Sequence, residues 1–438
     1  MKKSLLICTY IVIGIGLYVL YNLLMIGKNE QNIVEFEKLE KLAFQDLING
    51  EWQTLKKDSN IIYFHRAIYD SRKFEKWSSP CVTMFVLSNT QEVNDLEDLT
   101  CGYTFFNRTI RRNTNVILTD KAFRWHETHL QEFVVQCPVD GIYPIPTYIF
   151  IERNTNDRAT LKIERPYAGS HDIGICVPVI YGSFDTHMLI EWFELHKFFG
   201  VNFFDITVWN VSSDVLSVLK YYESQQQLLL TLVDIPFKVK LDQTASGLQP
   251  SKKPFFLKAF MPIALNECYL MNSLRAKYML SLDFDEFIYI NMTKYRSYNQ
   301  LLQNFHHDEY FVNLLMGKVK FDISCQMTLK SSSYIFRHAF RQPLETMKMA
   351  DNPKSFFRPT NCPYMGNHFC VWNKEVSQKG YPRAKTSQVF VSHFRKREKC
   401  EESVKQKYQI DRTLKFAAPT LLERFAKVKN KLRLKKIT

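Results

Sequence analysis

The segment "YMLSLDFDEFIYI", Tyr278–Ile290, places three carboxylates inside an apolar run. Its apolar residues are typical of a buried strand, where Asp283, Asp285 and Glu286 would each need a compensating charge. Side chains at positions i and i+2 of an extended chain point to the same face. We therefore expect Asp283 and Asp285 to face one ligand complex, while Glu286 points the other way.

The residues around this segment alternate between strand and helix patterns from Asp172 onward. Four apolar runs are expected as strands and three intervening runs as helices: residues 173–182, 201–210, 227–235 and 277–287, separated by 186–200, 212–223 and 255–275. Continuous apolar strands joined by helices are typical of a parallel α/β sheet. Because ligands of such sheets bind beyond the carboxyl ends of the strands, Asp283 and Asp285 are well placed for a site.

A divalent metal ion is the ligand that these two carboxylates favour. Mn²⁺ or Mg²⁺ takes oxygen ligands and often shares one or two protein carboxylates with substrate phosphates. The alternative for an isolated D-x-D pattern is an ordinary solvated strand end. Because the two carboxylates follow three strand–helix units, we favour a metal ion that is bound together with substrate phosphates.

Several ordered blocks in the chain resemble glycosyltransferase family 92. They are "AKYMLSLDFDEFIYI", "EWFELHKFFGVNFFDITVWN", "PKSFFRP", "GNHF" and "VSHFRKR", which start at residues 276, 191, 353, 366 and 391. The resemblance extends from about Asp172 to Lys407. Acceptor identity stays open, because the segment "FDISCQMTLK" matches no block of the family.

The resemblance implies a lumenal catalytic domain of the GT-A type, an α/β fold with a Rossmann-like, mostly parallel sheet. It implies a UDP-sugar donor and a glycan acceptor, with galactose transferred with inversion to give a β-linkage on a glycoprotein or glycolipid. Asp283 would contact the donor ribose or a metal-bound water. Asp285 would coordinate Mn²⁺ on the diphosphate.

The later blocks supply further candidates. A histidine metal ligand is expected, and His393 and His368 both lie in matching blocks, although either also fits a hydrogen-bonded structural histidine. Lys354, Arg358 and Arg395 flank these blocks and are candidates to bind the donor diphosphate. For each cation, a position on the solvated surface is an equally good interpretation.

Inversion requires a base that takes the proton of the acceptor hydroxyl. Glu345, in "QPLETMK" between the blocks, is the candidate, although a solvated glutamate fits the same pattern better. Two other functions compete with the transferase. A phosphohydrolase would need more carboxylates at strand ends than Asp234 supplies, and a glycan-binding protein would keep the fold without the activity.

The N-terminus predicts a membrane anchor. Residues 4–26 carry no charge and are long enough to cross a bilayer, and Lys2 and Lys3 precede them. A cleaved signal peptide is the alternative. We expect a cytosolic tail (1–3), a transmembrane signal anchor (4–26), a stem (27–76), a β-rich accessory module (77–168), the glycosyltransferase domain (169–415) and a basic C-terminal tail (416–438).

The resemblance implies a single-pass type II protein of the Golgi membrane, and the remaining composition agrees with a lumenal domain. The formal net charge of +14 suggests nucleic acid, but the lumenal topology argues against that partner. Nine cysteines follow Cys8 of the anchor, so disulfides are expected, with an odd thiol that is free or joins a homodimer. Three sequons mark candidate glycosylation sites: Asn107, Asn210 and Asn291.

Overall fold

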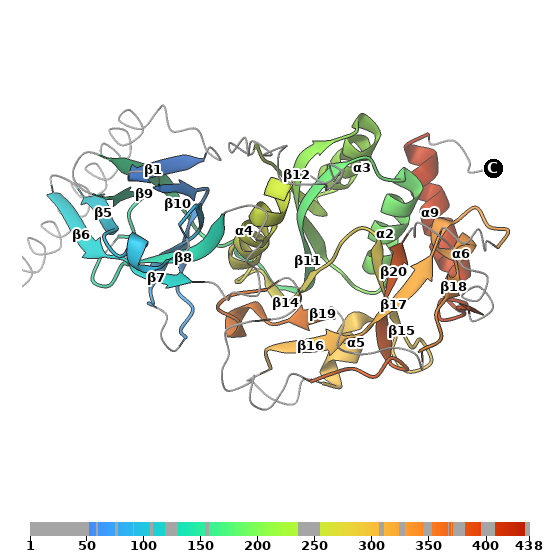
Figure 1. Cartoon of the computed structure of the whole chain (residues 1–438). Helices are drawn as coiled ribbons and strands as arrows, with labels where there is room; N and C mark the ends of the chain where they lie inside the picture. The colour runs from blue at the N-terminus through green and yellow to red at the C-terminus, as the bar shows by residue number, and fades with distance from the viewer. Residues whose placement is uncertain are drawn as a thin grey trace, which may run out of the picture.

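The structure is a computed structural model with three sheets in its described part (Figure 1). It describes residues 52–433 except for 58–59, 75–77, 91, 106–107, 119–129, 143, 154–156, 235–254, 306–310, 324–328, 345–352, 367, 369, 371–381 and 396–407. The predicted anchor, residues 4–26, lies outside this range. None of the described helices has the length and apolar character needed to cross a membrane.

The N-terminal module is a ten-stranded sheet, as the β-rich pattern predicted. Its strands are β1 (Gln53–Lys57), β2 (Asn60–Phe64), β3 (Ala67–Asp70), β4 (Cys81–Ser88), β5 (Thr100–Phe105), β6 (Arg108–Asn113), β7 (Asn115–Leu118), β8 (Gln131–Pro138), β9 (Tyr148–Glu152) and β10 (Arg158–Glu164). The module starts at β1, well before residue 77. The last part of the predicted stem, 27–76, therefore forms strands, because β1, β2 and β3 bury one face in the same core.

The second sheet has six strands in the order β13-β12-β11-β14-β19-β16. They are β13 (Leu228–Leu232), β12 (Phe203–Val211), β11 (His171–Gly182), β14 (Ala276–Ser281), β19 (Lys354–Phe357) and β16 (Asn313–Met316). The first four are parallel, which confirms the predicted strand–helix series. The sheet as a whole is mixed, because β19 runs antiparallel to both β14 and β16.

Three helices join the parallel strands: α2 (Thr186–Phe198), α3 (Ser213–Ser224) and α4 (Phe255–Met271). Helix α2 begins directly after β11, where the side chain of Asp185 accepts hydrogen bonds from the backbone N–H groups of His187 and Met188. A capped start at this place satisfies two N–H groups that the helix itself leaves unpaired. The N-terminal end of α2 therefore lies at the carboxyl edge of the sheet.

The third sheet has five strands in the order β15-β20-β17-β18-β21. They are β15 (Glu286–Ile290), β20 (Val389–Arg395), β17 (Lys318–Asp322), β18 (Phe340–Arg341) and β21 (Gln409–Ile410). The prediction of one strand through Tyr278–Ile290 was wrong. The chain leaves the second sheet after Ser281, makes a turn in which the Glu286 N–H donates to the Asp283 carbonyl at 3.0 Å, and enters the third sheet.

The C-terminal helix α9 (Ala418–Lys431) packs on α2. It buries Leu421, Phe425 and Val428, so one face of the predicted basic tail, 416–438, packs into the core, while most of its described residues stay exposed or partly exposed. Its Lys429 ammonium lies 2.6 Å from the buried carboxylate of Glu191 on α2. Two short helices, α5 (Tyr298–Gln303) and α6 (Tyr334–Arg337), cover other parts of this core.

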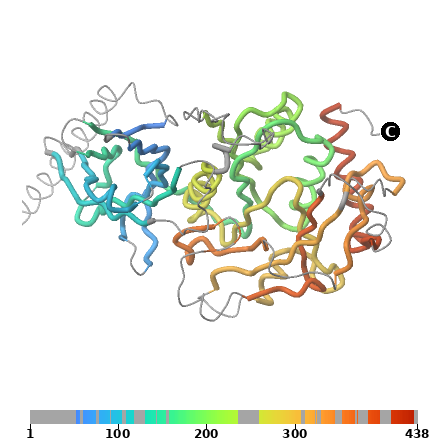
Figure 2. Tube along the Cα trace, in the orientation of Figure 1, coloured from blue at the N-terminus to red at the C-terminus, as the bar shows by residue number. Residues whose placement is uncertain are grey.

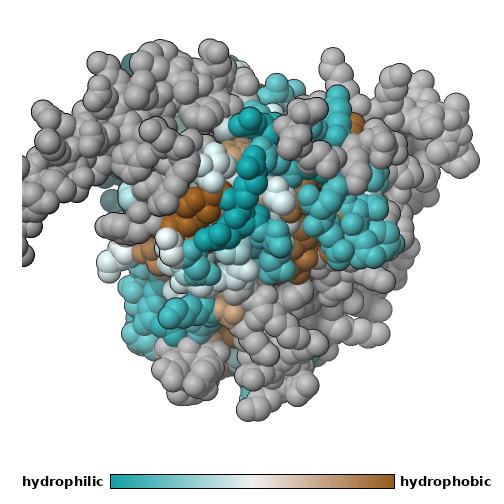
Figure 3. All heavy atoms as spheres, turned by 90° about the vertical axis from the view of Figure 1, so that its left-hand side faces the viewer, coloured by the Kyte–Doolittle hydropathy of each residue, from teal (hydrophilic) through white to brown (hydrophobic). Residues whose placement is uncertain are grey.

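The module packs directly against the second sheet. One apolar cluster takes residues from β4 and β8 on one side and from α4 on the other. The Arg72 guanidinium also donates to the carbonyls of Pro359 and Cys362 at 3.0 and 2.9 Å. Figure 2 shows the blue and cyan module at one end of the molecule and the red helix α9 at the other. The described residues on the module's end are largely hydrophilic, with small hydrophobic patches (Figure 3).

Among the described residues, disulfides join six cysteines, as the composition predicted. The pairs are Cys101–Cys137, Cys176–Cys268 and Cys362–Cys370. Cys81 is a buried free thiol among the described residues. Cys325 and Cys400 lie outside them, so the expected odd thiol and homodimer stay predictions.

Candidate active site

Two carboxylates lie at the carboxyl edge of the parallel strands. Asp283 and Asp285 follow the end of β14 in the turn that leads to the third sheet. Their side chains are 45% and 38% exposed, so neither is a buried charge. The apolar neighbours Leu282 and Phe284 are buried instead, which explains why the sequence resembles a continuous buried strand.

Asp283 pairs with Lys354. The distance from Lys354 Nζ to Asp283 Oδ2 is 3.5 Å, and the lysine side chain is only 2% exposed. Because β19 runs antiparallel to β14, its first residue lies where β14 ends. Burial alone would lower the pKa of Lys354, but the carboxylates of Asp283 and Glu286 outweigh it and raise that pKa, so the lysine stays charged.

Asp285 pairs with His393. The distance from His393 Nε2 to Asp285 Oδ2 is 3.1 Å, and the Phe394 N–H donates to the Asp285 carbonyl at 2.9 Å. Antiparallel pairing of β15 with β20 sets this contact, since Glu286 lies opposite His393 in the register. His393, one of the two candidate histidine ligands, thus contacts a carboxylate of the D-x-D pattern through its ring.

Glu286 is the buried carboxylate of the segment, and two lysines compensate its charge. Lys318 Nζ lies 2.6 Å from its Oε1 and Lys354 Nζ lies 3.1 Å from its Oε2. These lysines outweigh the effect of burial and lower the pKa of Glu286. The sequence analysis did not find Lys318, although the need of a buried carboxylate for a cation was a signal that one existed.

His368 lies near the two lysines. Burial and the charges of Lys354 and Lys318 lower its pKa to about 3, so its ring is neutral at physiological pH. Its backbone carbonyl accepts a hydrogen bond from the Ser355 hydroxyl at 2.9 Å. A neutral imidazole is the form that binds metal ions, so the chemical state of His368 suits its expected role.

Arg358 lies at the other end of β19 from Lys354, and the structure does not bring it to the carboxylates. A rise of about 3.3 Å per residue over four residues places their Cα atoms roughly 13 Å apart. Arg358 instead lies beside Val312, whose carbonyl accepts its backbone N–H at 2.8 Å. Arg395 ends β20, but its side chain lies outside the described part, as do Glu345 and Asn107.

The described side chains supply an incomplete metal site. Within the described ranges, no group of three or more His, Cys, Asp and Glu side chains has the geometry to hold a metal ion. Asp285 and His393 form a pair, and the half-exposed Asp285 carboxylate is open to a further partner. This donor set fits Mn²⁺ or Mg²⁺ if phosphate oxygens and water supply the remaining ligands, which is how such cations often bind.

Two aromatic residues extend the site along the same edge. Tyr181 and Trp209 lie near the ends of β11 and β12, with ring centroids 6.5 Å apart, and both are partly exposed. Burial and the charge of Asp283 raise the pKa of the Tyr181 hydroxyl, which places this ring near the carboxylate. Both rings also pack against the apolar cluster under the sheet, and the sequence analysis singled out neither of them.

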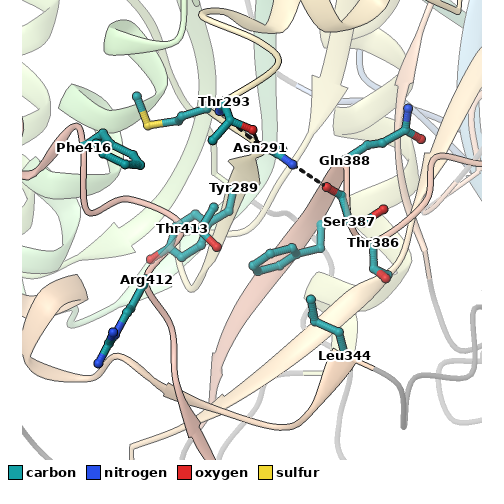
Figure 4. Close-up of a pocket in the computed structure, with 12 residues that line it drawn as sticks. Tyr289, Asn291, Thr293, Leu344, Thr386, Ser387, Gln388, Arg412, Thr413 and Phe416 are labelled. Carbon is teal, nitrogen blue, oxygen red and sulfur yellow. Dashed lines mark hydrogen bonds between the residues drawn. The ribbon is translucent and has the colours of Figure 1, made fainter.

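The described sequon asparagines differ in environment. Asn210 is exposed at the end of β12. Asn291 is partly buried beside a cavity of about 230 Å³ (Figure 4), where its Nδ2 donates to the Ser387 carbonyl at 3.0 Å. Its Oδ1 accepts from the hydroxyl of Thr293, the third residue of its own sequon, at 2.6 Å.

The fold and the site together define a mixed α/β protein with a carboxylate–histidine pair beyond its parallel strands. The family model of glycosyltransferase family 92 matches residues 171–427. The match spans more than half of the chain, and the chain belongs to this family. A comparison with curated proteins found no match.

Proposed function

We propose that the protein is a metal-dependent, UDP-sugar-dependent glycosyltransferase with a catalytic domain of the GT-A type. The observation that carries the proposal is the Asp285–His393 pair beside Asp283, beyond the ends of four parallel strands. Family membership supports glycosyl transfer. The strand order, with four parallel strands followed by an antiparallel β19, supports the Rossmann-like interpretation of the sheet.

In this proposal the donor diphosphate lies beside the turn Asp283–Glu286. Asp285 and His393 would hold Mn²⁺ or Mg²⁺, with His368 as a second histidine near the site, and Asp283 would contact the donor ribose or a water at the metal. A cation held there would supply positive charge for the diphosphate as it departs. Lys354 adds a fixed positive charge behind Asp283, where it acts through the carboxylate because its own side chain is buried.

The chemical step that we propose inverts the anomeric centre. The acceptor hydroxyl oxygen forms a bond to the anomeric carbon while the bond from that carbon to the diphosphate oxygen breaks. The hydroxyl proton passes to a base, and UDP leaves with the bonding electron pair. Galactose as donor sugar and a β-linked product on a glycoprotein or glycolipid rest on the resemblance to the family.

We also propose that the protein is a single-pass type II protein of the Golgi membrane with its catalytic domain in the lumen. The uncharged segment 4–26 behind two lysines supports the anchor. Three disulfides among the described residues support an oxidising compartment. These two observations do not distinguish the Golgi from other compartments of the secretory pathway. The proposal of the Golgi rests on the resemblance to the family.

The test is UDP release by the full-length protein, with a panel of UDP-sugars and glycan acceptors and with Mn²⁺ or EDTA. Asp285→Asn removes one metal ligand with little change in volume. Asp172→Asn is the matched control, because Asp172 is exposed at the opposite end of β11. Turnover that needs Mn²⁺, survives in the control and falls at least 100-fold in Asp285→Asn is the expected result. A wild-type protein that neither turns over nor binds any UDP-sugar refutes the proposal and favours the glycan-binding alternative.

A further inference from the structure

Glu286 is a charged residue beside the site that the proposed chemistry does not use. Its side chain is fully buried, so it does not reach a ligand at the carboxyl edge. A buried carboxylate is costly unless several partners satisfy it. A buried glutamate directly after Asp285 therefore needs a structural explanation, which its contacts supply.

Glu286 contacts two lysines, and each of the three residues is the first residue of a strand. Glu286 opens β15, Lys318 opens β17 and Lys354 opens β19, and the two lysines contact opposite oxygens of the carboxylate. The three residues therefore join the third sheet to the second sheet at the point where the chain passes between them.

Glu286 also closes the turn that carries the two aspartates. Its Oε2 accepts a hydrogen bond from the Asp283 backbone N–H at 3.1 Å, and its own backbone N–H donates to the Asp283 carbonyl at 3.0 Å. The first and last residues of the turn are thus bonded to each other in both directions. Asp285 lies inside the closed turn, and its backbone carbonyl is held by Phe394 of β20.

The same cluster orients Asp283. Lys354 Nζ lies between Glu286 Oε2, at 3.1 Å, and Asp283 Oδ2, at 3.5 Å. Lys318 on the far side of Glu286 supplies the second positive charge, which leaves Lys354 free to share its charge with Asp283. Loss of Lys318 would draw Lys354 toward Glu286 and away from Asp283.

We propose that Glu286, Lys318 and Lys354 form a positioning unit that holds Asp283 and Asp285 in the arrangement that the metal and the donor require. This inference rests on the proposed function of the same site. Residues that support metal ligands typically change metal affinity or activity by about 10–100-fold when they are replaced. We expect that range for the Mn²⁺ and donor concentrations at half-maximal turnover, and no change in the acceptor KM.

The experiment compares three substitutions at Lys318 in the full-length protein. Lys318→Met removes the charge, Lys318→Gln keeps a hydrogen-bond donor for Glu286, and Lys318→Arg keeps the charge. Lys320→Met is the matched control, because Lys320 lies two residues further along β17 and is exposed. Each variant is measured for Tm, for Mn²⁺, donor and acceptor dependence, and for backbone hydrogen exchange in the peptide that contains residues 283–286.

For Lys318→Met, the positioning unit predicts faster hydrogen exchange in that peptide. It also predicts that higher concentrations of Mn²⁺ and of donor are needed for half-maximal turnover. It also predicts partial rescue by Lys318→Arg and wild-type behaviour of Lys320→Met. A lower Tm with unchanged exchange and unchanged half-saturation constants would show a purely structural role and overturn the inference. If Lys318→Met does not fold, Lys318→Gln decides by the same criteria.

Hydrogen exchange separates this inference from the proposed function. If the wild-type protein transfers no sugar, the proposed function fails, but exchange in the turn still reports whether Lys318 holds it. Wild-type exchange in every Lys318 variant would refute the positioning unit even if the transferase activity is real.

Discussion

The stability of the protein should depend on pH through Glu132, a buried glutamate where the module meets the second sheet. Glu132 lies on β8 with 5% of its surface exposed. Its neighbours across the strand pair and across the interface, Leu87 and Tyr364, belong to the apolar cluster that joins the two parts. Burial raises the pKa of Glu132 to about 8, and a hydrogen bond with Tyr364 offsets only part of this effect.

The sign of the pH dependence follows from this raised pKa. Between the pKa of an unfolded glutamate, near 4.5, and about 8, the folded protein keeps a proton that the unfolded chain releases. Stability from this group is therefore fully present below pH 4.5, falls as the pH rises, and levels off above pH 8. A shift of about 3.5 pKa units corresponds to a loss of at most about 5 kcal/mol across this window.

Glu132→Gln should remove this contribution to the pH dependence. With an unfolding entropy of about 2.1 cal/mol/K per residue, roughly 380 residues give a Tm change of roughly 6 °C for about 5 kcal/mol. We expect the wild-type Tm to fall by up to this amount between pH 5 and pH 8 relative to the Tm of the variant. The amide itself changes stability by a constant amount, so the difference in slope is the decisive quantity.

The assay is thermal unfolding of the full-length protein between pH 5 and pH 8.5. Glu97→Gln is the matched control, because Glu97 belongs to the same module and is exposed. The control should keep the wild-type slope. Parallel slopes for the wild type and Glu132→Gln would show that Glu132 is ionised in the folded protein and would refute the reasoning.

Three further predictions test other parts of the structure. His393→Ala should raise the Mn²⁺ concentration for half-maximal turnover at least tenfold, measured by UDP release, because it removes the imidazole beside Asp285. Lys429→Met should destabilise the protein by roughly 3–5 kcal/mol, measured as a fall in Tm, because it removes the ammonium 2.6 Å from the buried carboxylate of Glu191 and leaves only neutral hydrogen-bond donors there. Asn291→Gln should leave electrophoretic mobility unchanged after expression in secretory cells, because the partly buried amide donates to a backbone carbonyl and is a poor glycan acceptor.

The parallel half of the second sheet could be predicted because its signals are local. Continuous apolar runs marked β11, β12, β13 and β14, and the helix between the first two ends near Gly200, whose φ of 100° favours glycine. The position of Asp283 and Asp285 after the fourth strand followed from the same series. The pairing of Asp283 with Lys354 and of Asp285 with His393 could not be predicted, because the two aspartates lie in a turn and not in the extended chain that the prediction assumed.

Long-range pairing set the remaining features, and the sequence carries no local sign of it. Lys318 approaches Glu286 because β17 and β15 both pair with β20, which is far away in the chain. The direction of β19 decides that Lys354 lies at the site while Arg358 lies at the opposite edge. The direction of a strand depends on the strands with which it pairs. The sequence alone therefore could not show which of the two basic residues of this block lies at the site.

The contact of Lys429 with Glu191 has a consequence for biosynthesis. The two residues are 238 positions apart, so α2 leaves the ribosome long before its charged partner is translated. Until Lys429 emerges, the carboxylate of Glu191 has no ammonium to neutralise it and α2 cannot bury that face without cost. The catalytic domain therefore reaches its final packing only when translation is almost complete, and a chain that stops before α9 leaves the face of α2 that packs on α9 uncovered.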